Sequence, residues 1–274
     1  MKMVKAYKLA RPDGWDFYTG ETINYRENIG RVVKCPNGNA KLGICSKGVI
    51  HASKNPNDCF VGARVPCSAY RVEGKPVCGD KEKWGFLDLA VLEEVHDLDK
   101  LFGWKYSEAI NPIKPLQGKS KKPTKDDIEL LHRWISIRDS VWVSVWDSVS
   151  VRVSVGDSVG DSVWDSVRDS VGDSVRDSVW DSVRVSVRDS VRDSVRVSVW
   201  VSVRDSVWDS VWTYIGSLFP NIKKWKYIKH KRGEYPFQPA VDLWKRGFVP
   251  SYDGETWRLH SGKNAKIVYE MEGK

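Results

Sequence analysis

The sequence lacks several features that define common protein classes. Its 274 residues contain no apolar run near the roughly 20 residues of a membrane-spanning helix, and residues 1–10 lack the apolar stretch of a signal peptide. Cysteine is scarce: the five cysteines form no Cys-x-x-Cys pair, which argues against a disulfide framework or a zinc site. Glycine-rich phosphate loops and short hydrolase motifs are also missing. We therefore expect an intracellular protein without membrane association, metal or cofactor.

Charge is distributed unevenly along the chain. The formal charge is +8 overall, but residues 1–137 carry +6, residues 138–212 carry −4 and residues 213–274 carry +6. Basic ends and an acidic middle favour a weak attraction that salt screens. Composition predicts an α+β protein with five segments, which are an N-terminal α+β domain (1–111), a basic linker (112–125), a helix leading into a repeat (126–137), the repeat (138–212) and a basic C-terminal helix and hairpin module (213–274).

Short-range signals predict individual elements at both ends of the chain. Alternating β-branched and aromatic residues predict strands over residues 3–9, 30–35, 68–72 and 86–95. Thr124 is a helix cap followed by two aspartates, which suit the positive end of a helix dipole. In the C-terminal module we predict a helix over 240–246, a hairpin of strands 248–252 and 255–259 around Asp253-Gly254, and a third strand over 266–270.

Residues 138–212 form a low-complexity array of only six residue types. The unit is Asp-Ser-Val-X, where X is Trp, Arg or Gly, and Val often replaces Asp. The phase slips by two residues at 148–154, so Val and Asp stay on odd positions throughout. Because the codons for the three X residues differ by one base, slippage of a twelve-base DNA unit is enough to explain this regularity.

The conformation of the array has three alternatives. Alternation predicts strands and therefore a narrow β-solenoid, but its inward face would carry 13 aspartates. One long α-helix is favoured, since Asp and Arg three residues apart pair on a helix, although the apolar stripe drifts by about 40° per unit. A disordered array is the third. In every case the array suits a spacer of variable length, and its seven tryptophans favour self-association.

A basic segment with interleaved aromatics follows the array. Lysines and arginine neutralise phosphates while tryptophan and tyrosine stack on bases, which is typical of single-stranded DNA or RNA binding. Lys119, Lys121 and Lys122 of the linker form a weaker second patch. The predicted nucleic-acid-binding residues are Lys223, Lys224, Trp225, Lys226, Tyr227, Lys229, Lys231 and Arg232.

One pair of residues is a candidate catalytic site. His51 lies at the end of one predicted strand and Glu93 at the end of another, and Tyr18 or Tyr70 would lie nearby. A histidine and a carboxylate on adjacent strand ends are typical of ADP-ribose-handling enzymes. The alternative is a hydrogen-bonded structural histidine and a solvated glutamate, and we consider it the better interpretation.

Several phrases resemble those of uncharacterised proteins from bacteriophages and environmental bacteria. They are KAYK (5–8), GVIHASKNPNDCF (48–60), LFGWKYSEAINPI (101–113), the DSVW/DSVR array and the segment from Tyr214 onward. The resemblance implies an origin in a phage or bacterium, a place in the cytoplasm of a bacterial host cell and a variable number of repeats. It brings no activity and no catalytic residues.

These observations favour a non-enzymatic interaction or scaffold protein, phage-encoded, whose repeat is a spacer that promotes self-association. The first alternative is single-stranded nucleic-acid binding through residues 223–232. The second alternative is an ADP-ribose-handling enzyme that uses His51 and Glu93.

Overall fold

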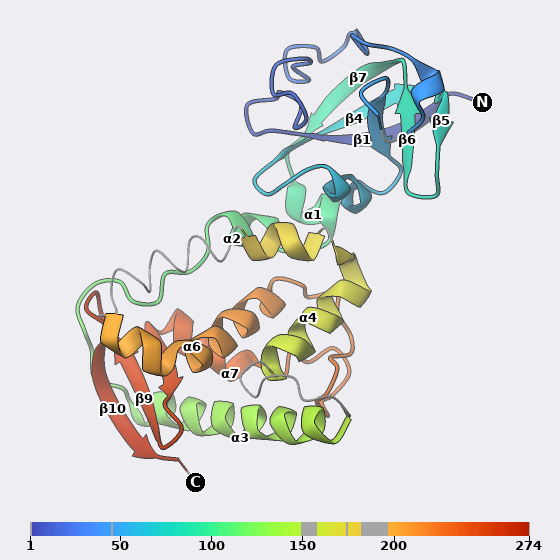
Figure 1. Ribbon diagram of the computed structural model, residues 1–274. Coiled ribbons are helices and arrows are strands. Elements are labelled where there is room, and N and C mark those ends of the chain that lie inside the picture. The colour runs from blue at the N-terminus through green and yellow to red at the C-terminus, as the bar shows by residue number, and fades with distance from the viewer. Residues whose placement is uncertain (1, 45, 149–157, 174, 182–196, 274) are drawn as a thin grey trace. The chain divides into compact units, whose positions relative to one another are not determined.

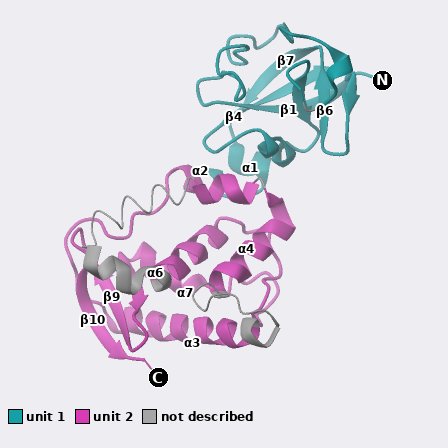
Figure 2. Cartoon of the chain, viewed as in Figure 1, with its two compact units in different colours: residues 1–106 teal, residues 107–274 magenta. Residues whose placement is uncertain are grey.

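The computed structural model describes residues 2–44, 46–148, 158–173, 175–181 and 197–273. They form two compact units, Met1–Tyr106 and Ser107–Lys274, which we call unit 1 and unit 2 (Figure 2). Helices and antiparallel sheets are both present, which confirms the α+β class (Figure 1). Unit 1 ends five residues before the predicted boundary at 111. Unit 2 combines the linker, the repeat and the C-terminal module, which the sequence predicted as separate segments.

Unit 1 is built on a seven-stranded sheet in the order β2-β7-β4-β1-β3-β6-β5, in which paired strands are antiparallel. The four strands predicted by range are present, the strand predicted at His51 is β3, and the short β5 and β6 were not predicted. The strands are β1 (Val4–Ala10), β2 (Val32–Lys34), β3 (Ile50–Ser53), β4 (Ser68–Gly74), β5 (Cys78–Gly79), β6 (Lys83–Phe86) and β7 (Asp88–Val95).

The core of unit 1 lies on the sheet. Tyr25, Tyr70 and Phe86 are buried there with aliphatic residues from β1, β3, β4 and β7. A second, aromatic cluster joins Phe60 to Phe102, whose ring stacks on Trp104. The elements of unit 1 outside the sheet are the 3-10 helices η1 (Ala40–Leu42) and η2 (Pro56–Val61) and the helix α1 (Leu98–Phe102), while α2 (Tyr106–Ile110) begins at the boundary and continues in unit 2.

Unit 2 packs helices with a three-stranded antiparallel sheet in the order β10-β9-β8. The predicted cap of α3 is present: Thr124 N–H and Oγ both donate to Asp127 Oδ2 at 2.8 Å. The predicted hairpin and third strand are also confirmed. The elements are α3 (Lys125–Ser148), α4 (Ser158–Val171), α6 (Val197–Ser217), α7 (Gln238–Lys245), β8 (Phe248–Tyr252), β9 (Thr256–Ser261) and β10 (Lys266–Glu272).

The repeat forms several packed helices where it is described. Every described repeat residue is helical except Gly172, which follows α4 with a φ of 87°. The favoured prediction of one long helix is therefore wrong for these residues, and a solenoid is not found in them. The drift of the apolar stripe gives the reason. Over the three units from Val159 to Val171 of α4 the stripe turns by about 120°, which is about the width of one buried helix face, and a longer helix would rotate the stripe away from its neighbours.

Valines at every fourth position of repeat helix α4 are buried. Val159, Val163 and Val167 of α4 are each at most 1% exposed, and α4 packs against both α3 and α6. Burial of an aliphatic side chain of this size contributes about 1.5–3 kcal/mol. The repeat is thus part of the hydrophobic core of unit 2.

Tryptophans at the X positions of the repeat pack on one another inside unit 2. The Trp180 ring stacks on Trp212 with a centroid distance of 3.8 Å, and Trp164 meets the same ring edge-on at 5.2 Å. At Gly160 a Cβ would lie 2.9 Å from Trp212, so only glycine leaves room for that ring. All three tryptophans are half-buried.

Candidate functional site

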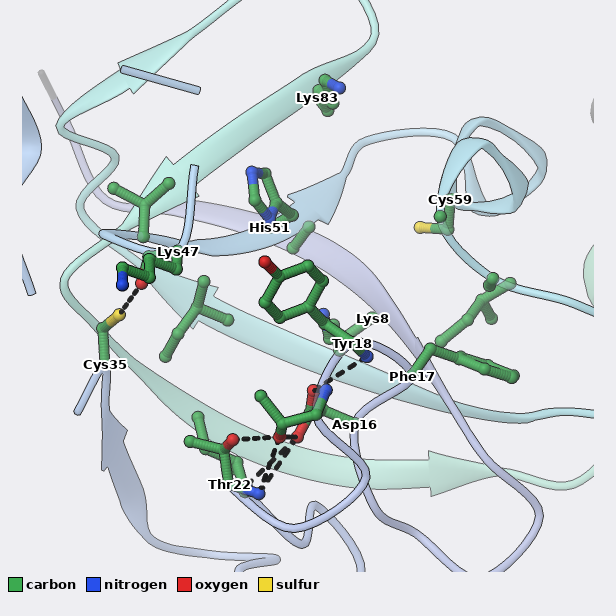
Figure 3. Close-up of a pocket in the computed structure, with 18 of the residues that line it drawn as sticks. Lys8, Asp16, Phe17, Tyr18, Thr22, Cys35, Lys47, His51, Cys59 and Lys83 are labelled. Atoms are coloured by element: carbon green, nitrogen blue, oxygen red, sulfur yellow. Dashed lines mark hydrogen bonds between the residues drawn. The ribbon is translucent and has the colours of Figure 1, made fainter. Parts of the chain in front are cut away.

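A cavity of about 680 Å³ opens in unit 1 between the loop after β1, strand β3 and helix η2 (Figure 3). Such a volume is typical of a site for a small molecule. The polar and aromatic side chains in its lining include those of Lys8, Asp16, Phe17, Tyr18, Thr22, Tyr25, Lys47, His51, Asp58, Cys59, Arg64 and Lys83.

Asp16 organises the loop that forms one wall. Its carboxylate accepts hydrogen bonds from the N–H groups of Tyr18 at 3.0 Å and Thr19 at 2.9 Å, and from the Thr19 hydroxyl at 2.8 Å. Burial alone would raise the pKa of Asp16, but the hydrogen bonds from Thr19 and Ile23 and the charge of Lys8 together lower it. The carboxylate is therefore ionised, and its oxygens are already occupied by the loop.

The side chain of Tyr18, in the same loop, is exposed to solvent. The Tyr18 side chain is 83% exposed, and Figure 3 shows its ring extending from the Asp16 loop toward His51. Its position beside the cavity makes it a surface on which a planar group can stack.

Lys8 reaches the cavity from β1. Its Nζ lies 5.5 Å from the centroid of the buried Tyr25 ring, and in the described part of the chain it forms no hydrogen bond or ion pair. Burial lowers the pKa of Lys8, although the nearby Cys59 and Asp16 oppose this shift. A half-buried ammonium group without an acceptor is costly, and an anion in the cavity would remove that cost.

His51 lies on β3 and faces the same cavity. Its Nε2–H donates to the carbonyl oxygen of Ile44, so the neutral ring presents Nδ1 as an acceptor. Burial lowers the pKa of His51, the hydrogen bond to Ile44 opposes this, and the charges of Lys8 and Lys83 lower it further. The ring is therefore neutral at pH 7.

Cys59 does not supply a reactive thiolate. Its Sγ–H donates to the carbonyl oxygen of Tyr7 at 3.2 Å, and burial raises the pKa of the thiol.

The side chains around the cavity carry a net positive charge. Four cationic side chains line the cavity against two carboxylates, and one of these, Asp16, already accepts hydrogen bonds from its own loop. The cavity therefore favours an anion.

The structure does not bring together the predicted catalytic pair. His51 is on β3 and Glu93 on β7, and the strands β1 and β4 lie between them in the sheet. Glu93 forms an ion pair with Arg71 at 2.8 Å, with both side chains more than half exposed. Of the two tyrosines considered with them, Tyr18 lines the cavity and Tyr70 is buried in the core.

The aromatic residues of segment 223–232 have partners inside unit 2. Trp225 is 2% exposed, and its ring lies 5.0 Å from that of Tyr235. The Tyr227 hydroxyl donates to Asp165 of α4 at 3.1 Å, and Lys226 pairs with Asp169 at 2.8 Å. Trp225 therefore packs against side chains of unit 2, and its ring is not exposed for stacking on a base. The exposed cations of the segment are Lys223, Lys224, Lys229, Lys231 and Arg232.

The predicted linker lies against the C-terminal hairpin. Lys263 N–H donates to the carbonyl oxygen of Gly118 at 2.9 Å, and Lys121 N–H to Ser261 Oγ at 3.4 Å. Lys121 Nζ lies 5.3 Å from the Phe248 ring centroid. Lysines far apart in sequence therefore form one surface, which we call the linker–hairpin patch and which consists of Lys119, Lys121, Lys122 and Lys263.

No group of three or more His, Cys, Asp or Glu side chains in the described ranges is placed to hold a metal ion. No helix among the described residues is long and apolar enough to cross a membrane.

Comparisons of the chain with protein-family models, with curated proteins and with solved structures each found no match. The resemblance to phage and bacterial proteins therefore stays a prediction.

Proposed function

We propose that the chain is a binding protein whose unit 1 takes an anionic small molecule, of the size of a nucleotide, in the cavity beside Lys8. The observation that carries this proposal is the unpaired, half-buried Lys8 amine facing a cavity of about 680 Å³. A phosphate oxygen beside Nζ would form a charge-assisted hydrogen bond where the described residues offer none.

The cavity also supports a ligand with a planar ring. Tyr18 offers an exposed ring at the cavity, and stacking of a base on an aromatic side chain contributes about 1–3 kcal/mol. Phosphates and a planar base together describe a nucleotide, which includes the ADP-ribose class predicted with His51. The present proposal keeps that ligand class and His51 but does not use Glu93, and it includes no reaction.

The test is calorimetric titration of the full-length chain with ADP, pyrophosphate and adenosine. We expect one ADP per chain, and weaker binding of pyrophosphate and adenosine because each has only part of the ligand. Replacing Lys8 by Gln should weaken ADP binding about tenfold or more, which corresponds to the loss of one charge-assisted hydrogen bond.

Lys5→Gln is the matched control. Lys5 lies on the same strand, is exposed and is not in the cavity lining. Its replacement removes the same charge from the same element and should leave ADP affinity unchanged. Equal losses in the two variants, or no ADP binding by the unmodified chain at millimolar concentration, would contradict the proposal.

For the whole chain we propose the role of a phage-encoded interaction protein, with self-association through the repeat as the prediction to measure. Half-buried tryptophans of the repeat support it, because rings at a surface remain able to contact a second copy. Light scattering of the full-length chain across a range of concentrations tests this role. A monomer at every concentration would contradict self-association and would leave unit 1 binding untouched.

Nucleic-acid binding is a second candidate, favoured by the linker–hairpin patch. Its lysines can contact phosphates without any stacking ring, so affinity should fall steeply with salt. Fluorescence anisotropy with single-stranded DNA and RNA is the measurement. Lys119→Gln with Lys122→Gln should weaken binding more than Lys223→Gln with Lys224→Gln, and the opposite order would restore the originally predicted segment.

A further inference from the structure

Lys8 has the surroundings of a reactive amine as well as those of an anion-binding residue. Its Nζ lies over the ring of Tyr25, which is 1% exposed, and the nearby lining includes Ile50 and Ala52, both at most 5% exposed. An apolar floor of this kind disfavours the charged form of an amine. In agreement with this geometry, burial lowers the pKa of Lys8.

The neighbouring polar groups do not tie up the Lys8 amine. The Asp16 carboxylate accepts hydrogen bonds from its own loop, and the Cys59 thiol donates to the carbonyl oxygen of Tyr7. Both groups hold fixed positions at the cavity without an ion pair to Nζ among the described contacts. The amine is thus able to reach a bound molecule.

We propose that Lys8 Nζ forms a reversible imine with the aldehyde group of a phosphate-bearing small molecule held in the unit 1 cavity. This inference rests on the proposed anion-binding function, because the remaining cations of the cavity, Lys47, Arg64 and Lys83, are the groups that would hold the phosphate. Chemically the ligand class is a phosphorylated aldehyde, for which an open-chain sugar phosphate is one example.

The reaction is balanced without an oxidant or a reductant. The Nζ lone pair attacks the carbonyl carbon, the C=O π electrons move to oxygen, and the amine proton passes to that oxygen to give a carbinolamine. Loss of water, made from the hydroxyl group and the second amine proton, then forms the C=N bond. His51 Nδ1, an acceptor at the same cavity, is suited to relay a proton between nitrogen and oxygen.

The experiment uses the full-length chain with pyridoxal 5′-phosphate as a phosphate-bearing aldehyde probe. Borohydride reduces the C=N bond to a stable secondary amine, and peptide mass mapping locates the label. We expect Lys8 to be labelled at a lower probe concentration than exposed lysines such as Lys5, with about one label per chain. Labelling of Lys8 should also begin at a lower pH than is usual for a lysine amine, because burial favours its neutral form.

Two variants separate chemistry from folding. Lys8→Arg removes the nucleophile, so the label at position 8 should disappear while the slower labelling of exposed lysines such as Lys5 stays the same. Lys5→Arg is the matched control and should be labelled at Lys8 like the unmodified chain. Circular dichroism of both variants verifies that the fold is retained.

The outcomes distinguish this inference from the proposed function. If ADP binds but Lys8 is labelled no faster than Lys5, the imine is excluded and the anion site stands. If Lys8 is labelled first and ADP prevents it, both hold. Labelling of Lys8 that neither ADP nor pyrophosphate displaces would overturn both, because aldehyde and phosphate would then not share a cavity.

Discussion

The two units reach a packed fold from very different sequences. Unit 1 uses a varied sequence, and its cavity collects side chains from loops and strands that are separated by up to 75 residues. Unit 2 takes a large part of its helices from six residue types in a four-residue unit. The comparison shows that low complexity does not prevent specific packing, provided that the repeated positions meet different neighbours.

The X positions of α4 illustrate this point. Gly160 faces the Trp212 ring, Trp164 meets the same ring edge-on, and Arg168 is on the surface. Each alternative of the repeat thus occupies a place that suits its size. DNA slippage explains how such an array arises, but the contacts indicate that its present residues are no longer interchangeable.

The largest expected effect concerns the buried ion pair of unit 2. Arg138 Nε donates to Asp209 Oδ2 at 2.8 Å, and their side chains are 15% and 2% exposed. Arg138→Ala leaves the aspartate buried without this partner and should lower the free energy of unfolding by about 3–5 kcal/mol. Urea unfolding followed by circular dichroism at the helix band measures the loss.

The control for this change is Arg168→Ala in the same repeat. Arg168 pairs with Asp165 at 3.1 Å, but its side chain is 43% exposed. An exposed pair contributes only about 0–1 kcal/mol. If both variants lost a similar free energy of unfolding, burial of the ion pair would not determine its contribution to stability.

The next effect comes from exchanging residues that the repeat itself uses. Gly160→Trp places a large ring where a Cβ alone would approach Trp212 to 2.9 Å, and overpacking of this kind costs about 1–3 kcal/mol. Arg168→Trp makes the equivalent exchange at an exposed position and should change the urea midpoint little. If Gly160→Trp is equally harmless, the X residues are interchangeable and the account of the repeat is wrong.

A similar but ligand-specific effect is expected in unit 1. Tyr18→Ala removes an 83% exposed ring, so stability should hardly change while ADP affinity falls by about 1–3 kcal/mol. Pyrophosphate has no ring, and its affinity should stay the same. A parallel calorimetric titration of the two ligands measures both numbers, and equal losses would show that Tyr18 does not stack.

The smallest effect is a pH dependence from His260 in unit 2. Its Nε2 lies 2.7 Å from Ser251 Oγ and its Nδ1 lies 3.0 Å from the Ala265 carbonyl oxygen. Burial lowers the pKa of His260, although the Ala265 carbonyl opposes this. The pKa of His260 in the folded chain is below the unfolded value of about 6.5. The contribution of neutral His260 to the free energy of unfolding is therefore fully present above pH 6.5 and is lost as the pH falls.

Urea midpoints between pH 7.5 and 5 measure this dependence. The slope expected from one histidine is at most about 1.4 kcal/mol per pH unit. His260→Gln, which does not titrate in this range, should reduce the slope. An unchanged slope in the variant would assign the dependence to other groups.

Local signals predicted much of the fold, because they depend on neighbours in sequence. The Thr124 cap and the Asp253-Gly254 turn both lie where expected, since a cap and a hairpin need only a few residues. The end of α4 at Val171 was not predicted, because the drift of the apolar stripe becomes decisive only when a neighbouring helix is present.

The candidate site was predicted only in part, since distant segments build it. Lys8 resembles any polar residue in an alternating strand, and only the loop around Asp16, strand β3 and helix η2 enclose it. Asp16 followed by Thr19 is a recognisable turn signal that indicates the loop but not the cavity. The burial of Trp225 could not be predicted, because nothing near it in sequence indicates the packing of Tyr235 on its ring.

Hydrogen exchange of the full-length chain with and without ADP, read by mass spectrometry, tests the central claim most directly. The account predicts slower exchange in residues 16–23 and 46–53 of unit 1, which line the cavity, and unchanged exchange in unit 2. Protection that falls on residues 223–232 or on the linker–hairpin patch, or no protection at saturating ADP, would contradict it.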